Sequence, residues 1–151
     1  MKHLFLIACL CLLSGGLAAD KKPATPEEQS TARIEELKDK VAHDSERDIC
    51  IDSAELVREL VEQFDRQMSA GKLGASQQIL TDIGTYADKA KEGATNSHHK
   101  LKQAELILHK SSRRLADIGQ SLAVENRPAI AAAVQRIEAA DDEILNQVFK
   151  H

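Results

Sequence analysis

Apolar and small residues recur at alternating steps of three and four positions through the second half of the chain. The series begins at Leu80 and ends at Leu122, and no charged residue falls on it. Its members are Leu80, Ile83, Ala87, Ala90, Ala94, Ser97, Leu101, Ala104, Leu108, Ser111, Leu115, Ile118 and Leu122. This seven-residue repeat predicts a helix whose seam stays against partner helices. An unbroken helix over this range would be about 65 Å long, at about 1.5 Å per residue.

The weakest part of this predicted helix is the stretch from Gly93 to Asn96, because glycine and asparagine both favour helix poorly. A break there is the alternative to one long helix. The repeat keeps its phase through this stretch, so the pattern favours the unbroken form.

Two further apolar stripes predict helices on either side of the long one. The first helix is expected to begin at Thr25-Pro26, with Thr25 as N-cap and Glu28 completing a capping box. Its stripe is interrupted at residues 43–48, which predicts a solvated patch, a kink or a short loop. Residues 69–76 contain two glycines and predict a turn, and Asn126-Arg127-Pro128 predicts the start of a last helix.

The register of these stripes predicts an all-α fold, with residues 26–151 forming one helical domain. Residues 24–47, 100–122 and 126–149 are expected to form an antiparallel three-helix bundle around the long central helix. The last helix would then cover only the far half of the central helix. Residues 48–99 are therefore expected to project as a two-helix hairpin.

This projecting hairpin would carry more apolar surface than a single seam buries. The residues concerned are Leu56, Leu60, Phe64, Ile79 and Ile83. An apolar face without a covering helix predicts a contact with another protein or with a second copy of the chain. The alternative is that these side chains simply flank the seam.

The first 19 residues are typical of a secretory signal peptide. Lys2 and His3 precede a ten-residue apolar run, Leu4–Leu13. A cleavage region of mostly small residues, residues 14–19, follows this run. The run is too short to span a bilayer. We therefore expect an exported protein, periplasmic or secreted, with residues 20–25 as a tether and no stable membrane insertion after signal cleavage.

Charge and composition narrow the function classes. The formal net charge is −4, and the chain has no tryptophan and one tyrosine. A mildly acidic chain with few aromatic residues argues against nucleic acid as a partner. Alternating β-branched runs are absent, so the sequence predicts no strands.

Four residues are weak candidates for a metal site, because the predicted register brings them to similar heights. They are His43, His98, His99 and Cys50. Zinc or copper needs three or four converging ligands, but adjacent residues of a helix point about 100° apart. Surface histidines are therefore the favoured interpretation, and we predict no metal and no cofactor. An extracytoplasmic metal- or small-ligand-binding protein remains the alternative function. No catalytic constellation is evident, so we predict that the chain is not an enzyme.

Residues 98–114 are locally basic, with five lysines and arginines against one glutamate. Such a segment can bind an anion or an anionic membrane surface. The favoured interpretation is that these cations pair with acidic residues of the neighbouring helices and so set helix direction.

Parts of the sequence show two resemblances to known kinds of protein. The segment LVRELVEQFDRQMSAGKLGASQQILTDIGTYADKA, Leu56–Ala90, resembles one tetratricopeptide helix-turn-helix unit, which implies a packing style. The segments LKQAELILHKSSRRLADI and RPAIAAAVQRIEAADDEIL resemble small exported bacterial helical proteins without an assigned role. That second resemblance implies a helical fold and export.

Overall fold

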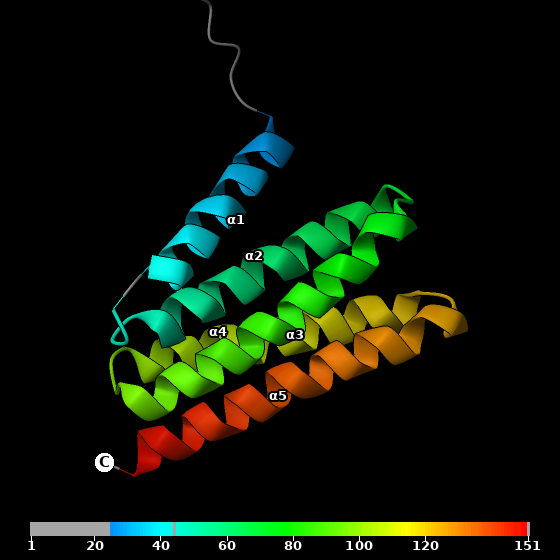
Figure 1. Cartoon of the computed structure of the whole chain (residues 1–151). Coiled ribbons are helices and arrows are strands. Elements are labelled where there is room, and N and C mark those ends of the chain that lie inside the picture. The colour runs from blue at the N-terminus through cyan, green and yellow to red at the C-terminus, as the bar shows by residue number, and fades with distance from the viewer. Residues whose placement is uncertain (1–24, 44, 151) are drawn as a thin grey trace, which may run out of the picture.

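The computed structural model describes residues 25–43 and 45–150, and it shows only helices and turns within them. The predicted signal peptide and residues 20–24 of the tether lie outside the described residues. The helices are α1 (Pro26–His43), α2 (Ile49–Ser69), α3 (Leu73–Asn96), α4 (Leu101–Ser121) and α5 (Arg127–Phe149), with a 3₁₀ turn, η1 (Val124–Asn126), before α5. The predicted all-α class is confirmed (Figure 1).

The predicted unbroken helix from Leu80 to Leu122 is wrong, because the chain turns between α3 and α4. Ser97 is extended, with φ −146° and ψ 136°, and Lys100 has a left-handed backbone with φ 55°. The seven-residue phase nevertheless continues across the four-residue turn. Both helices need an inward face, so the repeat reports burial on each side of the turn and not continuity through it.

Side chains from two loops stabilise this turn. The Ser97 hydroxyl donates to the Arg47 carbonyl over 3.0 Å and accepts from the His99 amide over 3.2 Å. The His99 ring nitrogen Nδ1 lies 2.8 Å from an Asp48 carboxylate oxygen. The α3–α4 turn is therefore bonded to the turn that precedes α2. These contacts join positions far apart in the sequence, which explains why a local pattern did not reveal the break.

Two helical hairpins, α2–α3 and α4–α5, pack side by side to form a four-helix bundle (Figure 1). Bonds between the turns that precede α2 and α4, and the Arg114–Asp65 pair further along these helices, all join residues 49 to 51 positions apart, so the two helices run parallel. Helices α3 and α5 also pack against each other. Around the bundle the order is α2, α3, α5, α4.

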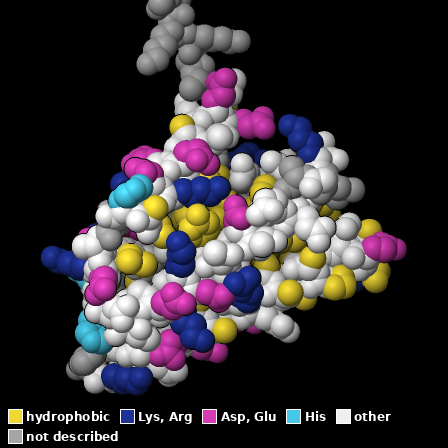
Figure 2. Space-filling model, viewed as in Figure 1, with side chains coloured by type: hydrophobic (Ala, Val, Ile, Leu, Met, Phe, Trp, Pro, Cys, Tyr) yellow, Lys and Arg dark blue, Asp and Glu magenta, His cyan; other side chains and the backbone are white. Residues whose placement is uncertain are grey.

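Helix α1 lies outside the four-helix bundle and packs on α2, antiparallel to it. Its buried stripe consists of Ile34, Leu37 and Val41. Lys38 of α1 also lies 3.5 Å from Asp82 of α3. In Figure 1 the N-terminal end of α1 diverges from the bundle, and the space-filling view from the same side shows charged side chains of both signs distributed over this face (Figure 2).

The expected three-helix bundle with a projecting hairpin is therefore replaced by a different arrangement. Helix α5 runs along α3 as well as α4, and α4 runs along α2. The hairpin of residues 48–99 is consequently half of the bundle and does not stand free. The physical reason is the turn at residues 97–100, which folds α4 back onto the hairpin.

Several predicted helix ends are confirmed. The Glu28 amide donates to the Thr25 hydroxyl over 3.3 Å, and Glu28 accepts from the Thr25 amide over 2.7 Å. These bonds complete the capping box, and the Thr25 amide is the chief cause of a lowered Glu28 pKa. In the turn between α2 and α3, Gly71 adopts a φ of +72°, which glycine tolerates without strain.

Candidate functional site

The five residues predicted to form an interaction face lie in the core. Leu56, Leu60, Phe64, Ile79 and Ile83 are each at most 7% exposed. Their apolar surface is buried because the hairpin is covered by α1 on one side and by α4 and α5 on others. These side chains therefore offer no accessible binding face in this structure.

The weak metal candidates do not come together as a ligand set. His43 pairs with Asp39 of its own helix, 3.1 Å away, and His99 pairs with Asp48. Cys50 is fully buried, and burial raises the pKa of its thiol to about 12. Within residues 25–43 and 45–150 no group of three or more histidine, cysteine or acidic side chains could hold a metal ion.

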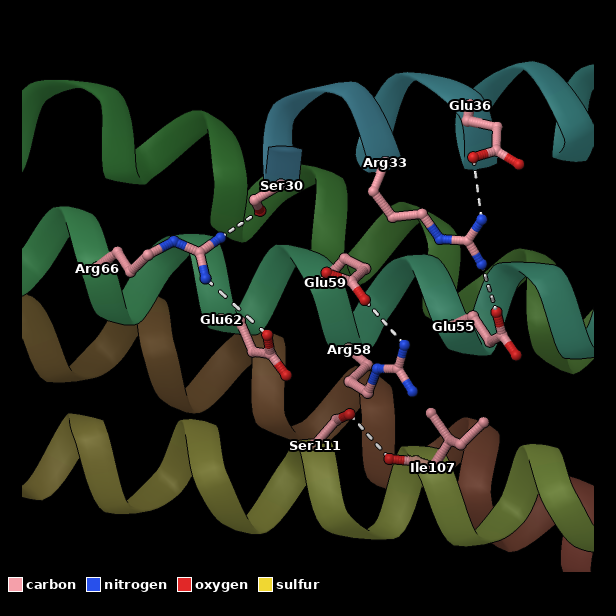
Figure 3. Close-up of polar contacts among 10 residues, drawn as sticks. All are labelled: Ser30, Arg33, Glu36, Glu55, Arg58, Glu59, Glu62, Arg66, Ile107 and Ser111. Atoms are coloured by element: carbon pink, nitrogen blue, oxygen red, sulfur yellow. Dashed lines mark hydrogen bonds and ion pairs between the residues drawn. The ribbon is translucent and has the colours of Figure 1, made fainter. Parts of the chain in front are cut away.

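A groove with a volume of about 590 Å³ lies between the parallel helices α2 and α4. We call it the α2–α4 groove. Its lining comes from both helices and combines aliphatic, polar and charged side chains, namely Arg58, Val61, Glu62, Gln103, Leu106, Ile107, Lys110, Ser111 and Arg114. Figure 3 shows α2 between α1 and α4, with Arg58 directed toward the α4 side.

The middle of the α2–α4 groove is aliphatic. Val61 is buried and Ile107 is half-buried, while Leu106 is 48% exposed. Leu106 is one of only four large hydrophobic side chains that are exposed in the described part of the chain. The Ser111 hydroxyl donates to the Ile107 carbonyl over 2.8 Å, so it is engaged with the helix backbone. The groove therefore presents an apolar contact strip and no activated nucleophile.

Cations exceed carboxylates around this strip. Arg58 lies 2.8 Å from Glu59, and Arg114 lies 2.5 Å from Asp65. Lys110 forms no ion pair with any residue that the structure describes. Glu62 is the single carboxylate in the lining. Among the lining residues, cations therefore outnumber carboxylates by three to one, and Lys110 is the one whose charge no carboxylate of the described residues balances.

The structure agrees only in part with the favoured interpretation of residues 98–114, in which the cations pair with acidic residues of the neighbouring helices. Arg114 pairs across helices with Asp65, and His109 with Asp141 of α5. Within the described residues, Lys100, Lys102, Lys110 and Arg113 have no carboxylate partner. The acidic residues of α1 cannot neutralise them, because α1 packs on α2 and not on α4. Most of the basic charge of α4 is therefore unneutralised.

A second polar cluster lies between α4 and α5. His109 Nδ1 is 3.3 Å from Asp141 Oδ2, and the other carboxylate oxygen, Oδ1, is buried without a hydrogen-bond partner among the described residues. Burial raises the pKa of Asp141, while the His109 hydrogen bond acts in the opposite direction. The nearby Ser112 hydroxyl donates to the His109 carbonyl and not to its ring. No hydroxyl is thus aligned for nucleophilic catalysis at this pair.

Sequence reasoning missed the α2–α4 groove, although a signal was present. The segment Leu106-Ile107-Leu108 has three consecutive aliphatic residues, but only Leu108 falls on the seven-residue repeat. The other two therefore have no place in the predicted seam. Aliphatic residues outside the repeat belong either to a wider core or to a surface contact. The extent of their burial in the structure distinguishes these two possibilities.

Comparisons with protein-family models, with curated proteins and with solved structures found no match for the chain. None of the helices in residues 25–43 and 45–150 combines the length and apolar character needed to cross a membrane.

Proposed function

We propose that this protein is an exported, non-enzymatic helical-bundle module that binds another protein, or a second copy of itself, through the α2–α4 groove. One observation carries the proposal. An exposed leucine, Leu106, and a lysine without an ion-pair partner among the described residues, Lys110, lie one helical turn apart in the α2–α4 groove.

The energetics of exposure support a binding role for this groove. Leaving a leucine half exposed forgoes part of the roughly 1.5–3 kcal/mol that its full burial provides. Residues buried elsewhere on α4, such as Leu108 and Leu115, are fully covered. A partner that covers Leu106 and Ile107 would recover this apolar burial, which is how interface cores are stabilised.

The arrangement of the two hairpins also supports the proposal. Parallel packing of α2 on α4 places equivalent faces of the hairpins side by side, as in stacked helical repeats. The sequence resemblance of Leu56–Ala90 to a tetratricopeptide unit agrees with this packing style.

Photo-crosslinking tests the proposal directly. A photoreactive amino acid placed at Gln103, in the groove, is expected to give discrete adducts when cells producing the protein are irradiated. The same amino acid at Lys91, an exposed position on α3, is the matched control. Mass spectrometry distinguishes a second copy from another protein. Absence of adducts at Gln103, or identical adducts at both positions, would contradict the proposal.

A further inference from the structure

We infer that the α2–α4 groove binds an acidic amphipathic helix of a partner protein. This inference rests on the proposed function and adds the chemistry of the partner. It follows from three features of the groove, which are its length, its aliphatic strip and its charge.

The length of the groove suits a short helix. Along α4 the lining extends from Gln103 to Arg114, which corresponds to about 16 Å or three helical turns. A peptide helix of that length presents three or four apolar residues on one face. Helix-in-groove recognition uses such spaced anchors.

The chain itself shows how a helix docks on α2. Helix α1 contributes three buried aliphatic residues, Ile34, Leu37 and Val41, and forms flanking ion pairs with the bundle. Arg33 lies 3.3 Å from Glu55, and Lys38 lies 3.5 Å from Asp82. The packing of α1 on the bundle thus combines an aliphatic stripe with flanking ion pairs.

The α2–α4 groove offers a similar aliphatic strip with a mainly cationic lining. At the α1 contact the ion pairs run both ways, since Arg33 and Lys38 of α1 face Glu55 and Asp82 while Glu27 of α1 faces Lys72. Toward the groove, the bundle presents Arg58, Lys110 and Arg114 against Glu62. Complementarity across an interface therefore requires the helix that occupies the groove to be acidic.

Fluorescence anisotropy with synthetic peptides tests this inference on the full chain. The probe is a labelled peptide of about 14 residues, or about 21 Å as a helix, with leucines along one face and glutamates on both flanks. The comparison peptide replaces every glutamate with lysine. We expect saturable binding of the acidic peptide, at least about tenfold tighter than the basic one and weakened by 0.5 M NaCl, because salt screens exposed charges.

Two variants and two matched controls locate the site. Lys110→Glu and Leu106→Gln are each expected to weaken binding of the acidic peptide about tenfold, because they reverse a rim charge and remove an apolar anchor. Lys91→Glu on α3 and Leu145→Gln on α5 alter the same residue types elsewhere on the surface, and Leu145 is 38% exposed. We expect both controls to bind like the unaltered chain. Circular dichroism checks that all four variants are folded.

Several outcomes would overturn the inference. They are no saturable binding, equal binding of the acidic and basic peptides, and equal effects of the site and control variants. Vesicles of phosphatidylglycerol and phosphatidylcholine provide a separate arm. Vesicle binding that Lys110→Glu abolishes, without peptide binding, would assign the groove to an anionic lipid surface instead.

Failure of this inference is distinguishable from failure of the proposed function. Crosslinked adducts at Gln103 without acidic-peptide binding would leave the groove as an interaction site and overturn only the partner chemistry. Absence of both would overturn the proposed function as well. An adduct of twice the chain mass, with no peptide binding, would replace the partner helix with a second copy.

Discussion

Helix α2 is packed tightly on one side and loosely on another. Against α3, a close approach occurs where a Cβ atom built on Gly93 would lie 2.7 Å from the Cys50 amide nitrogen. Ala87, Ala90 and Ala94 of α3 are fully buried. Against α4, a groove of about 590 Å³ remains, and Leu106 is half exposed. Small residues let the backbones of α2 and α3 approach closely, whereas longer side chains, among them Arg58, Lys110 and Arg114, line the groove between α2 and α4.

This difference indicates a division of roles between the two sides of α2. The closed side contributes burial and packing to stability, and changes there are expected to destabilise the fold. The exposed lining of the open side, such as Leu106, is expected to contribute less to stability and is available for binding. Four pairs of variants test this comparison, in order of decreasing expected effect.

The largest effect is expected from two nearby leucines of α4. Leu108→Ala removes a fully buried side chain and should lower the free energy of unfolding by about 2–5 kcal/mol. Leu106→Ala alters a half-exposed side chain in the groove and should lower it by only about 1 kcal/mol, since about half of the leucine's burial is lost. Urea unfolding measures both. Similar losses for the two variants would show that the groove is part of the stabilising core.

The next effect concerns two helical glycines of α3. Gly93→Ala places a Cβ against the Cys50 backbone, which cannot rotate away. Overpacking of this kind costs about 1–3 kcal/mol and should exceed the gain of up to about 1 kcal/mol in helix propensity. Gly84→Ala, the control, meets only the flexible end of Arg136. Thermal unfolding should therefore show a loss for Gly93→Ala and no loss, or a gain, for Gly84→Ala. Equal melting temperatures would contradict the close approach of α2 and α3.

A smaller effect is expected at a buried hydroxyl of α2. Ser53 is fully buried, and its hydroxyl has no hydrogen-bond partner among the described residues. Ser53→Ala should raise the free energy of unfolding by about 1 kcal/mol, because an unsatisfied polar group is removed. Ser111→Ala removes a hydroxyl that is bonded to Ile107 and should bring no such gain. Chemical unfolding of both variants gives the comparison, and a destabilised Ser53→Ala would show that the hydroxyl has a partner.

The smallest effect is a pH dependence at Asp141, between α4 and α5. Burial raises its folded-state pKa, so ionisation disfavours the folded form, and stability falls as pH rises through that pKa. Asp141→Asn should raise the melting temperature at pH 7, and the gain should disappear near pH 3, where the carboxyl is protonated in both states. Asp142→Asn on the exposed side of α5 is the control. A lower melting temperature for Asp141→Asn at pH 7 would contradict this sign.

Much of the helical content could be predicted because it depends on local patterns. The capping box at Thr25, the turn after α2 and the start of α5 at Arg127 all follow from nearby residues. The buried positions of the repeat, such as Ile83, Ala94 and Leu108, were also predictable. Inward-facing residues of a helix recur at the same spacing whether or not the helix is interrupted, so the buried positions could be predicted without knowing where each helix ends.

The turn at residues 97–100 could not be predicted in the same way. The sequence contains weak helix formers there, but the bonds of Ser97 and His99 to the loop before α2 join positions about 50 residues apart. That one turn changes the architecture, since it places α4 on α2 and buries the face expected to be free. The α2–α4 groove depends on this packing and was therefore equally hidden.

Helix α1 is attached along a single flank, whereas each helix of the bundle packs against at least two others. Its amides should consequently exchange with deuterium well before those of α2, through local opening that leaves the bundle intact. Such an opening would uncover the aliphatic residues of α2 that Ile34, Leu37 and Val41 normally shield. The N-terminal helix is therefore expected to open before the bundle unfolds, and its opening would expose a second apolar surface on α2.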